Sequence, residues 1–378
     1  MNHRLLKNAR VVLPDKDKIM RADVTLEGGK IREVGKDLNV PENSDIIDLE
    51  GNYLSPGFID LQVNGAAGVD FLTCQLEGVK RAGKTWLEHG VTSFLGTIIT
   101  QGLDEMHAGI KRLSRSGTPN LLGIHVEGPF LSKEKRGTHN PTHVREPDRS
   151  SFDRIIKNCE EEIELFTFAP EVDGGEQLLN WIKAEGFVPS IGHSTASYET
   201  ALDFVGQGVS SFTHLFNGMK GIHHRQPGTA GAALNSSAFT GVIADGLHLH
   251  PGAIKLIEKI KSEKRIYLVS DAIAAAGMED GQYVLGDQEI TVEDGLAKLD
   301  DGTIAGSTLT LDRAVENYVN FSGATLLDAV RAVTLNPARL LNRADQIGSM
   351  KEGSRADLVV FDENYEVKYT LVEGEVLY

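Results

Sequence analysis

Residues that could bind a divalent metal recur at the ends of short apolar segments in this sequence. Glu127 closes "GIHVE", His193 follows "VPSIG" and His214 follows "SSFT". Two imidazoles and one carboxylate leave one position of a divalent metal open for water, which is the pattern of a catalytic site. Any one of these groups alone could be a hydrogen-bonded core residue, but the three together favour a metal site.

A carboxylate that could move a proton ends another apolar segment. Asp271 follows "IYLVS", where it could take a proton from a metal-bound water and return it to a leaving group. Its alternative role is to cap the segment that follows, since Asp is a good helix N-cap. His125 shares a strand face with Glu127, and we expect it to support that ligand rather than to bind the metal.

Two amides stand on the first of these segments, "FIDLQVN". Gln62 and Asn64 lie on one face of the expected strand. An amide oxygen is a weaker ligand for zinc-like metals than an imidazole. We therefore predict about one divalent metal per chain, with both amides filling the space of a second metal and Gln62 close to the water of the first.

A (β/α)8 TIM-type barrel would bring these side chains together, because its active sites form where the carboxyl ends of the strands converge. Amphipathic stretches such as "GGEQLLNWIKAEG" alternate with apolar strands and end at Gly, a usual helix stop. We expect eight strands at residues 57–63, 91–99, 121–127, 165–169, 187–192, 211–214, 240–244 and 265–270. The alternative is an open doubly wound sheet, but no G-x-G-x-x-G turn follows the first strand.

The two ends of the chain differ from its middle. Residues 1–54 and 344–378 are short alternating segments separated by Gly, Pro and Asn, so we expect one small β-sandwich domain built from both termini. The barrel would span residues 55–343. Within it, residues 281–307 form strands joined by Asp-Gly turns, an insertion long enough to cover the barrel mouth.

Composition narrows the class of protein. The net charge of −16 over 378 residues argues against nucleic-acid binding, which requires a basic face. Two cysteines, Cys74 and Cys159, cannot form a disulfide framework. No apolar run reaches the roughly 18 residues of a membrane span, and the start lacks the apolar core of a signal peptide. We expect a cytoplasmic protein with no membrane or nucleic-acid partner.

Seven motifs carry a resemblance that covers nearly the whole chain: "PGFIDLQVNG", "HVEGPF", "KRGTHNP", "GHS", "THLFNGM", "ADGLHLHP" and "VSDA". As a set they resemble the N-acetylglucosamine-6-phosphate deacetylases of the amidohydrolase superfamily. The resemblance implies that Glu127, His193 and His214 hold one divalent metal, zinc or iron. It further implies that Asp271 is the general base and then the acid, and that His139 polarises the acetyl carbonyl.

The same resemblance implies a substrate site and a partner. Arg225 would bind the phosphate by reaching across from the neighbouring subunit of a homodimer. Independently, His223, His224 and Arg225 concentrate positive charge in an acidic chain, and the Arg fork fits phosphate oxygens. The other implied substrate-binding residues are Thr138, His139, Asn217, Gly218, Asp245, His248, Ala305 and Gly306. Gly218 stands where some relatives carry Ala, and a backbone contact should survive that change.

The implied reaction is hydrolysis of the N-acetyl group of N-acetylglucosamine 6-phosphate to glucosamine 6-phosphate and acetate, in amino-sugar catabolism and cell-wall sugar recycling. One alternative is an amidohydrolase acting on another N-acetylated sugar phosphate. A cyclic-amide hydrolase such as dihydroorotase is a second, but the His-x-His pair and bridging lysine of those enzymes are missing. A third is a non-catalytic scaffold, which would have been free to lose the metal ligands kept here.

Overall fold

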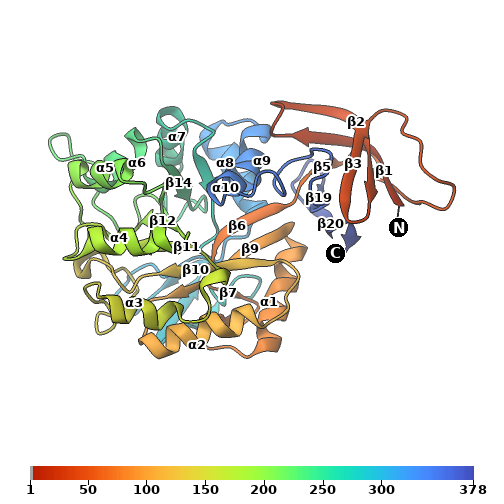
Figure 1. The fold of residues 1–378 in the computed structure, drawn as a ribbon. Helices are drawn as coiled ribbons and strands as arrows, with labels where there is room; N and C mark the ends of the chain where they lie inside the picture. Colours follow the sequence, from red (N-terminus) through yellow and green to blue (C-terminus); the bar gives the residue numbers. More distant parts are fainter. Residues whose placement is uncertain (1–2) are drawn as a thin grey trace.

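In the computed structural model, which describes residues 3–378, eight parallel strands form a nearly closed barrel (Figure 1). Each strand pairs with the next along the chain. The strands are β6 (Phe58–Val63), β9 (Val91–Ile99), β10 (Leu121–Glu127), β11 (Ile163–Phe168), β12 (Val188–Ile191), β13 (Ser211–Phe212), β14 (Phe239–Val242) and β15 (Ile266–Leu268). All eight lie where the sequence predicts them, so the predicted barrel is confirmed.

The barrel closes through the segment that follows β15. The backbone N–H of Asp271 donates to the carbonyl of Gln62 at 2.9 Å, and that of Asn64 donates to the carbonyl of Ala272 at 2.8 Å. These bonds join the last strand to the first and exclude the open doubly wound alternative. They also place Asp271 beside the amide pair at one end of the barrel.

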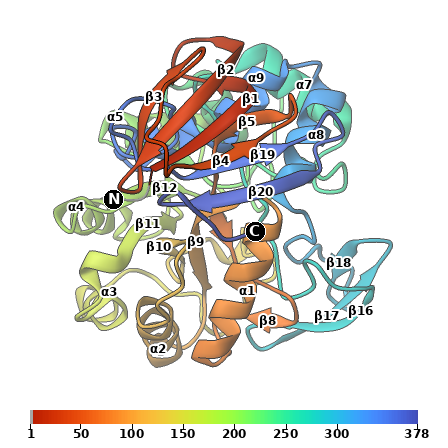
Figure 2. The same ribbon diagram turned by 90° about the vertical axis from the view of Figure 1, so that its right-hand side faces the viewer.

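Helices cover the outside of the barrel (Figure 2). In α1, Val79, Ala82 and Trp86 are buried at helical spacing, so one face of the helix packs on the strands. Gly186 follows α4 with a φ of 83°, the left-handed conformation of a helix stop. The helices are α1 (Leu76–Glu88), α2 (Leu103–Ser114), α3 (Arg149–Ile156), α4 (Gly175–Ala184), α5 (Tyr198–Gly206), α6 (Gly228–Asn235), α7 (Pro251–Ile260), α8 (Leu311–Ser322), α9 (Leu326–Val333) and α10 (Leu335–Leu340). Within residues 3–378, none is both long and apolar enough to cross a membrane.

Strands from both ends of the chain build a second body, drawn in red and dark blue in Figure 1. They form one eight-stranded sheet, and β5 pairs with β1 on one side and β19 on the other. The strands are β1 (His3–Leu13), β2 (Lys18–Glu27), β3 (Lys30–Gly35), β4 (Asp45–Asp48), β5 (Tyr53–Pro56), β19 (Leu358–Phe361), β20 (Val367–Val372) and β21 (Glu375–Val376). A β domain from both termini is therefore confirmed, while its boundaries, 1–54 with 344–378, stay a prediction.

The segment after β15 carries a small antiparallel sheet of β16 (Gly281–Leu285), β17 (Gln288–Glu293) and β18 (Leu296–Lys298) (Figure 2). Its β16–β17 turn is held by two hydrogen bonds. The N–H of Gly286 donates to Asp70 at 3.1 Å, and the amide of Asn140 donates to Asp287 at 2.7 Å. The turn is thereby tied to the loop that contains His139.

Candidate active site

Three buried side chains converge at the carboxyl end of the barrel. The Nε2 atoms of His193 and His214 lie 3.2 Å and 3.0 Å from Oε1 of Glu127. They also lie 3.1 Å from each other. Tetrahedral ligands bonded at about 2.0–2.1 Å lie about 3.3 Å apart, so this spacing suits one metal ion.

The chemistry of these atoms also fits a cation. Nδ1 of His193 lies 2.8 Å from the carbonyl oxygen of Lys135, which can only accept a hydrogen bond. The proton of a neutral His193 therefore sits on Nδ1, and its Nε2 lone pair faces the carboxylate of Glu127. Nε2 of His193 and Oε1 of Glu127 are both electron-rich and lie 3.2 Å apart, so a proton or a metal cation must lie between them.

His139 adds a third imidazole to this cluster. Its Nε2 lies 3.2 Å from Nε2 of His193, and ligand atoms of Glu127, His139 and His193 all lie within 4.8 Å of one another. This trio differs from the predicted one by containing His139 in place of His214. We favour His214, because its Nε2 and that of His193 approach the same carboxylate oxygen, whereas His139 forms no hydrogen bond to Glu127 within the described residues.

The protonation of these groups follows from burial and from their neighbours. Burial, assisted by the charge of His193, lowers the pKa of His139 to about 3, so it is a neutral imidazole near pH 7. Burial opposes the charge on Glu127, but the close contacts of its carboxylate with the His193 and His214 imidazoles outweigh burial and hold the pKa of Glu127 well below its usual range. A fixed negative charge thus faces the imidazoles.

Asp271 has the properties of a group that exchanges a proton near neutral pH. Burial, followed by the negative charge of Glu127, raises the pKa of Asp271 to about 6. Both amides of the first strand contact this charged set. Asn64 Nδ2 donates to Asp271 Oδ1 at 2.8 Å, and Gln62 Nε2 donates to Glu127 Oε1 at 3.1 Å. The amides therefore orient the two carboxylates through neutral hydrogen bonds.

Three of these residues have strained backbone conformations. His193, His214 and Asp271 have φ angles of 48°, 30° and 51°, in the left-handed region that non-glycine residues rarely adopt. Such conformations cost on the order of 1–3 kcal/mol each and persist only where surrounding contacts hold them. Gly218 lies against this strained turn, since a Cβ at residue 218 would be 2.6 Å from Nδ1 of His193.

Glu171 holds the turn at His193, and it was not among the site residues predicted from the sequence. Its carboxylate accepts hydrogen bonds from Ser194 Oγ at 2.7 Å, from Thr195 Oγ1 at 2.9 Å and from the Thr195 N–H. One sequence signal could have identified Glu171. It lies three residues after β11, a barrel strand whose carboxyl end carries no other candidate residue. Glu171 therefore anchors the two residues that follow a candidate ligand.

We expect Glu171→Gln to lower metal affinity and kcat/KM by about 10–100-fold, the usual effect of losing a partner that orients a metal ligand. The amide NH2 replaces an acceptor oxygen, so at least one hydrogen bond to the turn is lost. Metal content after dialysis against graded chelator, together with the unfolding midpoint, checks this. Glu176→Gln, at an exposed residue of α4, is the control. Wild-type affinity and rate in Glu171→Gln would remove Glu171 from the site.

The predicted residues largely share one cavity of about 280 Å³. Those that line it are Asn64, Glu127, Thr138, His139, His193, His214, Asn217, Gly218, His248, Asp271 and Gly306. It is also lined by residues that were not named as candidates: Ile99, Gly137 and, from the predicted insertion at residues 281–307, Leu285, Thr303 and Ile304.

Five candidates lie outside this lining. Gln62 contacts Glu127, and Asp245 stands behind the cavity, with Oδ2 2.6 Å from Nδ1 of His248. Ala305 is buried beside Gly306. Arg225 is exposed and contacts His224 at 2.6 Å, so a single chain does not bring it to the cavity. His125 uses Nδ1 on Leu61 O (3.1 Å) and Nε2 on Thr167 Oγ1 (2.7 Å), which leaves neither nitrogen for a metal.

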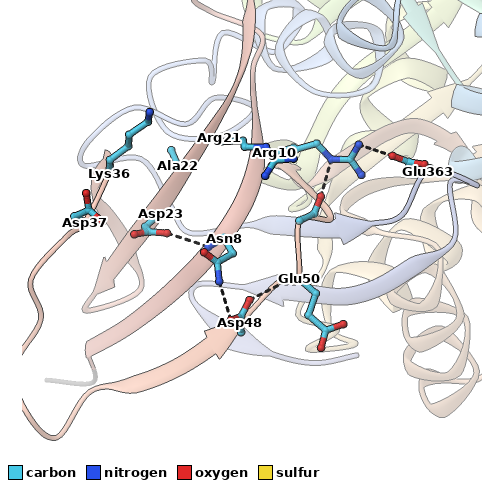
Figure 3. A pocket seen from close by; sticks show the side chains of 11 residues that line it. Asn8, Arg10, Arg21, Ala22, Asp23, Lys36, Asp37, Asp48, Glu50 and Glu363 are labelled. Carbon is cyan, nitrogen blue, oxygen red and sulfur yellow. Dashed lines mark hydrogen bonds and ion pairs between the residues drawn. The ribbon is translucent and has the colours of Figure 1, made fainter.

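A larger hollow of about 690 Å³ lies over the β domain (Figure 3). Its polar groups bind one another: Arg10 pairs with Glu363 at 2.7 Å, and Asn8 donates to Asp48 at 2.8 Å. No histidine lines it. We therefore place the chemistry in the smaller cavity of the barrel.

Comparison with known proteins identifies the family of this chain. The sequence profile of the amidohydrolase family matches residues 53–377. N-acetylglucosamine-6-phosphate deacetylase of Homo sapiens is 35% identical, over 96% of this chain and 92% of that protein. N-acetylgalactosamine-6-phosphate deacetylase of Escherichia coli O157:H7 is 34% identical, over 88% and 89%. The crystal structure of N-acetylglucosamine-6-phosphate deacetylase from Pasteurella multocida superposes with a TM-score of 0.94 at 32% identity, over 99% of both chains.

Proposed function

The chain belongs to the amidohydrolase family, and from this premise we propose that it hydrolyses the N-acetyl group of N-acetylglucosamine 6-phosphate. The products are glucosamine 6-phosphate and acetate, which places the enzyme in amino-sugar catabolism and cell-wall sugar recycling. The observation that carries the proposal is the convergence of Glu127, His193, His214 and Asp271 on one buried cavity. Relatives that carry this activity align over almost the whole chain.

Glu127, His193 and His214 would hold one divalent metal, zinc or iron, which would act as a Lewis acid and lower the pKa of water toward neutral pH. Asp271 accepts the proton of the attacking water and later gives it to the amine that leaves. Asn64 keeps the carboxylate of Asp271 turned toward the cavity. His139 is neutral and donates its single N–H to the acetyl oxygen as negative charge develops there.

The remaining residues bind the sugar phosphate. Thr138, Asn217, the Gly218 backbone and His248 contact the substrate, and Asp245 fixes the His248 ring. Ala305 and Gly306 belong to the loop that closes over it.

Arg225 supplies the phosphate contact from the second subunit of a homodimer. The neighbouring Ile222 is 54% exposed, as expected for a loop that awaits a partner chain. Mass photometry of the purified enzyme tests the dimer, and a monomer under assay conditions would contradict this role.

An acetate-release assay tests the proposed function. N-acetylglucosamine 6-phosphate should be hydrolysed, and the unphosphorylated sugar should have a kcat/KM lower by about 100-fold or more, because charged hydrogen bonds to phosphate are lost. Arg225→Ala should reduce the difference in kcat/KM between the phosphorylated and the unphosphorylated sugar. N-acetylgalactosamine 6-phosphate is the second candidate, because a 34% identical relative carries that name. The larger kcat/KM of the two identifies the substrate, and no acetate from either would refute the proposal.

A further inference from the structure

We infer that Ile99 and Leu285 form an acyl subsite that limits the enzyme to N-acyl groups of about two carbons. This inference rests on the proposed function. Three aliphatic side chains line the cavity, namely Ile99, Leu285 and Ile304, and its other lining residues are polar or glycine. Ile99 and Leu285 are 7% and 3% exposed, whereas Ile304 is 37% exposed and lies at the rim. An N-acetyl sugar phosphate carries one methyl group, and it is attached to the carbon that reacts.

The strand register places Ile99 beside the reacting groups. Ile99 ends β9 and lies opposite Glu127 of β10. Residues opposite each other on adjacent strands point to the same face of a sheet, and both side chains line the cavity. On the other side of β9 is β6, the strand that leads into Asn64, the partner of Asp271. The methyl of an acyl group held between His139 and Asp271 therefore meets Ile99.

Leu285, which would contact the acyl methyl, is held in place by the turn that follows it. Leu285 ends β16, and the next residue, Gly286, is tied to Asp70 at 3.1 Å. A Cβ at Gly286 would lie 3.2 Å from Ile99 Cδ1 and 3.3 Å from Leu72 Cδ2, so the turn is already packed against the barrel. In such an apolar pocket one additional methylene changes kcat/KM by about 10–200-fold.

A series of N-formyl, N-acetyl, N-propionyl and N-butyryl glucosamine 6-phosphates tests the subsite, with release of the common product glucosamine 6-phosphate as the measurement. We expect wild-type kcat/KM to fall about 10-fold or more for each carbon beyond acetyl. Leu285→Ala should raise the butyryl-to-acetyl ratio by about 10-fold or more, and Ile99→Val should shift it less in the same direction. Leu285→Phe should lower the acetyl-to-formyl ratio.

Val284→Ala is the matched control, because Val284 precedes Leu285 in β16 and is 45% exposed. It should leave both ratios unchanged. Ile99→Val removes a single methyl, so it keeps the test valid if Leu285→Ala does not fold. Unchanged ratios in folded variants that still hydrolyse the acetyl compound would overturn the subsite alone. A wild-type enzyme that releases no acetate would overturn the proposed function and the subsite with it.

Discussion

Asp271→Asn is expected to lower kcat by about 10²–10⁴-fold, the range for loss of a general acid–base group. The amide has the shape of the carboxylate and can still accept the hydrogen bond from Asn64, but it cannot take a proton. Steady-state acetate release measures the rate, and metal analysis of the purified variant measures occupancy, which should equal that of the wild type.

The control for this variant is Asp173→Asn, an exposed carboxylate in the loop after β11. It should keep wild-type turnover. Turnover above a tenth of wild type in Asp271→Asn would mean that another group moves the proton. Loss of metal would instead mean that Asp271 is a ligand.

Glu127→Gln should reduce both metal content and turnover, the latter by about 10³-fold or more, which corresponds to about 4 kcal/mol of transition-state stabilisation. Its Oε1 is the atom that both His193 and His214 approach. A neutral amide there removes the negative charge that stabilises a cation between the imidazoles. Metal analysis and acetate release, before and after chelation and addition of zinc or ferrous iron, provide the measurement.

Wild-type enzyme should contain about one metal per chain, lose activity on chelation and regain it on metal addition, while Glu127→Gln should not recover at the same metal concentration. Glu199→Gln, on the exposed side of α5, should behave as wild type. Two tightly held metals per wild-type chain would contradict the interpretation of Gln62 and Asn64 as neutral replacements for a second ligand pair.

The sequence predicted the barrel and much of the cavity for a physical reason. Strands buried on both faces are continuous apolar runs, so a polar residue at the end of a run marks the barrel mouth. Glu127, His193 and Asp271 all carry that signal. Because parallel strands place all their carboxyl ends together, position along the chain was sufficient to predict that these side chains meet.

Other parts of the site have no such signal. Glu171 acts through hydrogen bonds to residues 23 and 24 positions away, which no local pattern encodes. Ile99 and Leu285 have the side chains of ordinary core residues, and only the cavity distinguishes them. The position of Arg225 relative to a substrate depends on a second chain, so a single sequence cannot determine it.

The β domain is built from both termini, so it cannot be completed until late in synthesis at the ribosome. Pro56 of β5 pairs with Leu358 of β19, and these residues are 302 positions apart (358 − 56). At about 5–20 residues per second, translation takes about 15–60 s to cover that distance. Throughout this interval one edge of β5 has no partner strand, and an open edge can pair with other chains. The nascent polypeptide is therefore exposed to aggregation along this edge of β5 until β19 has emerged from the ribosome.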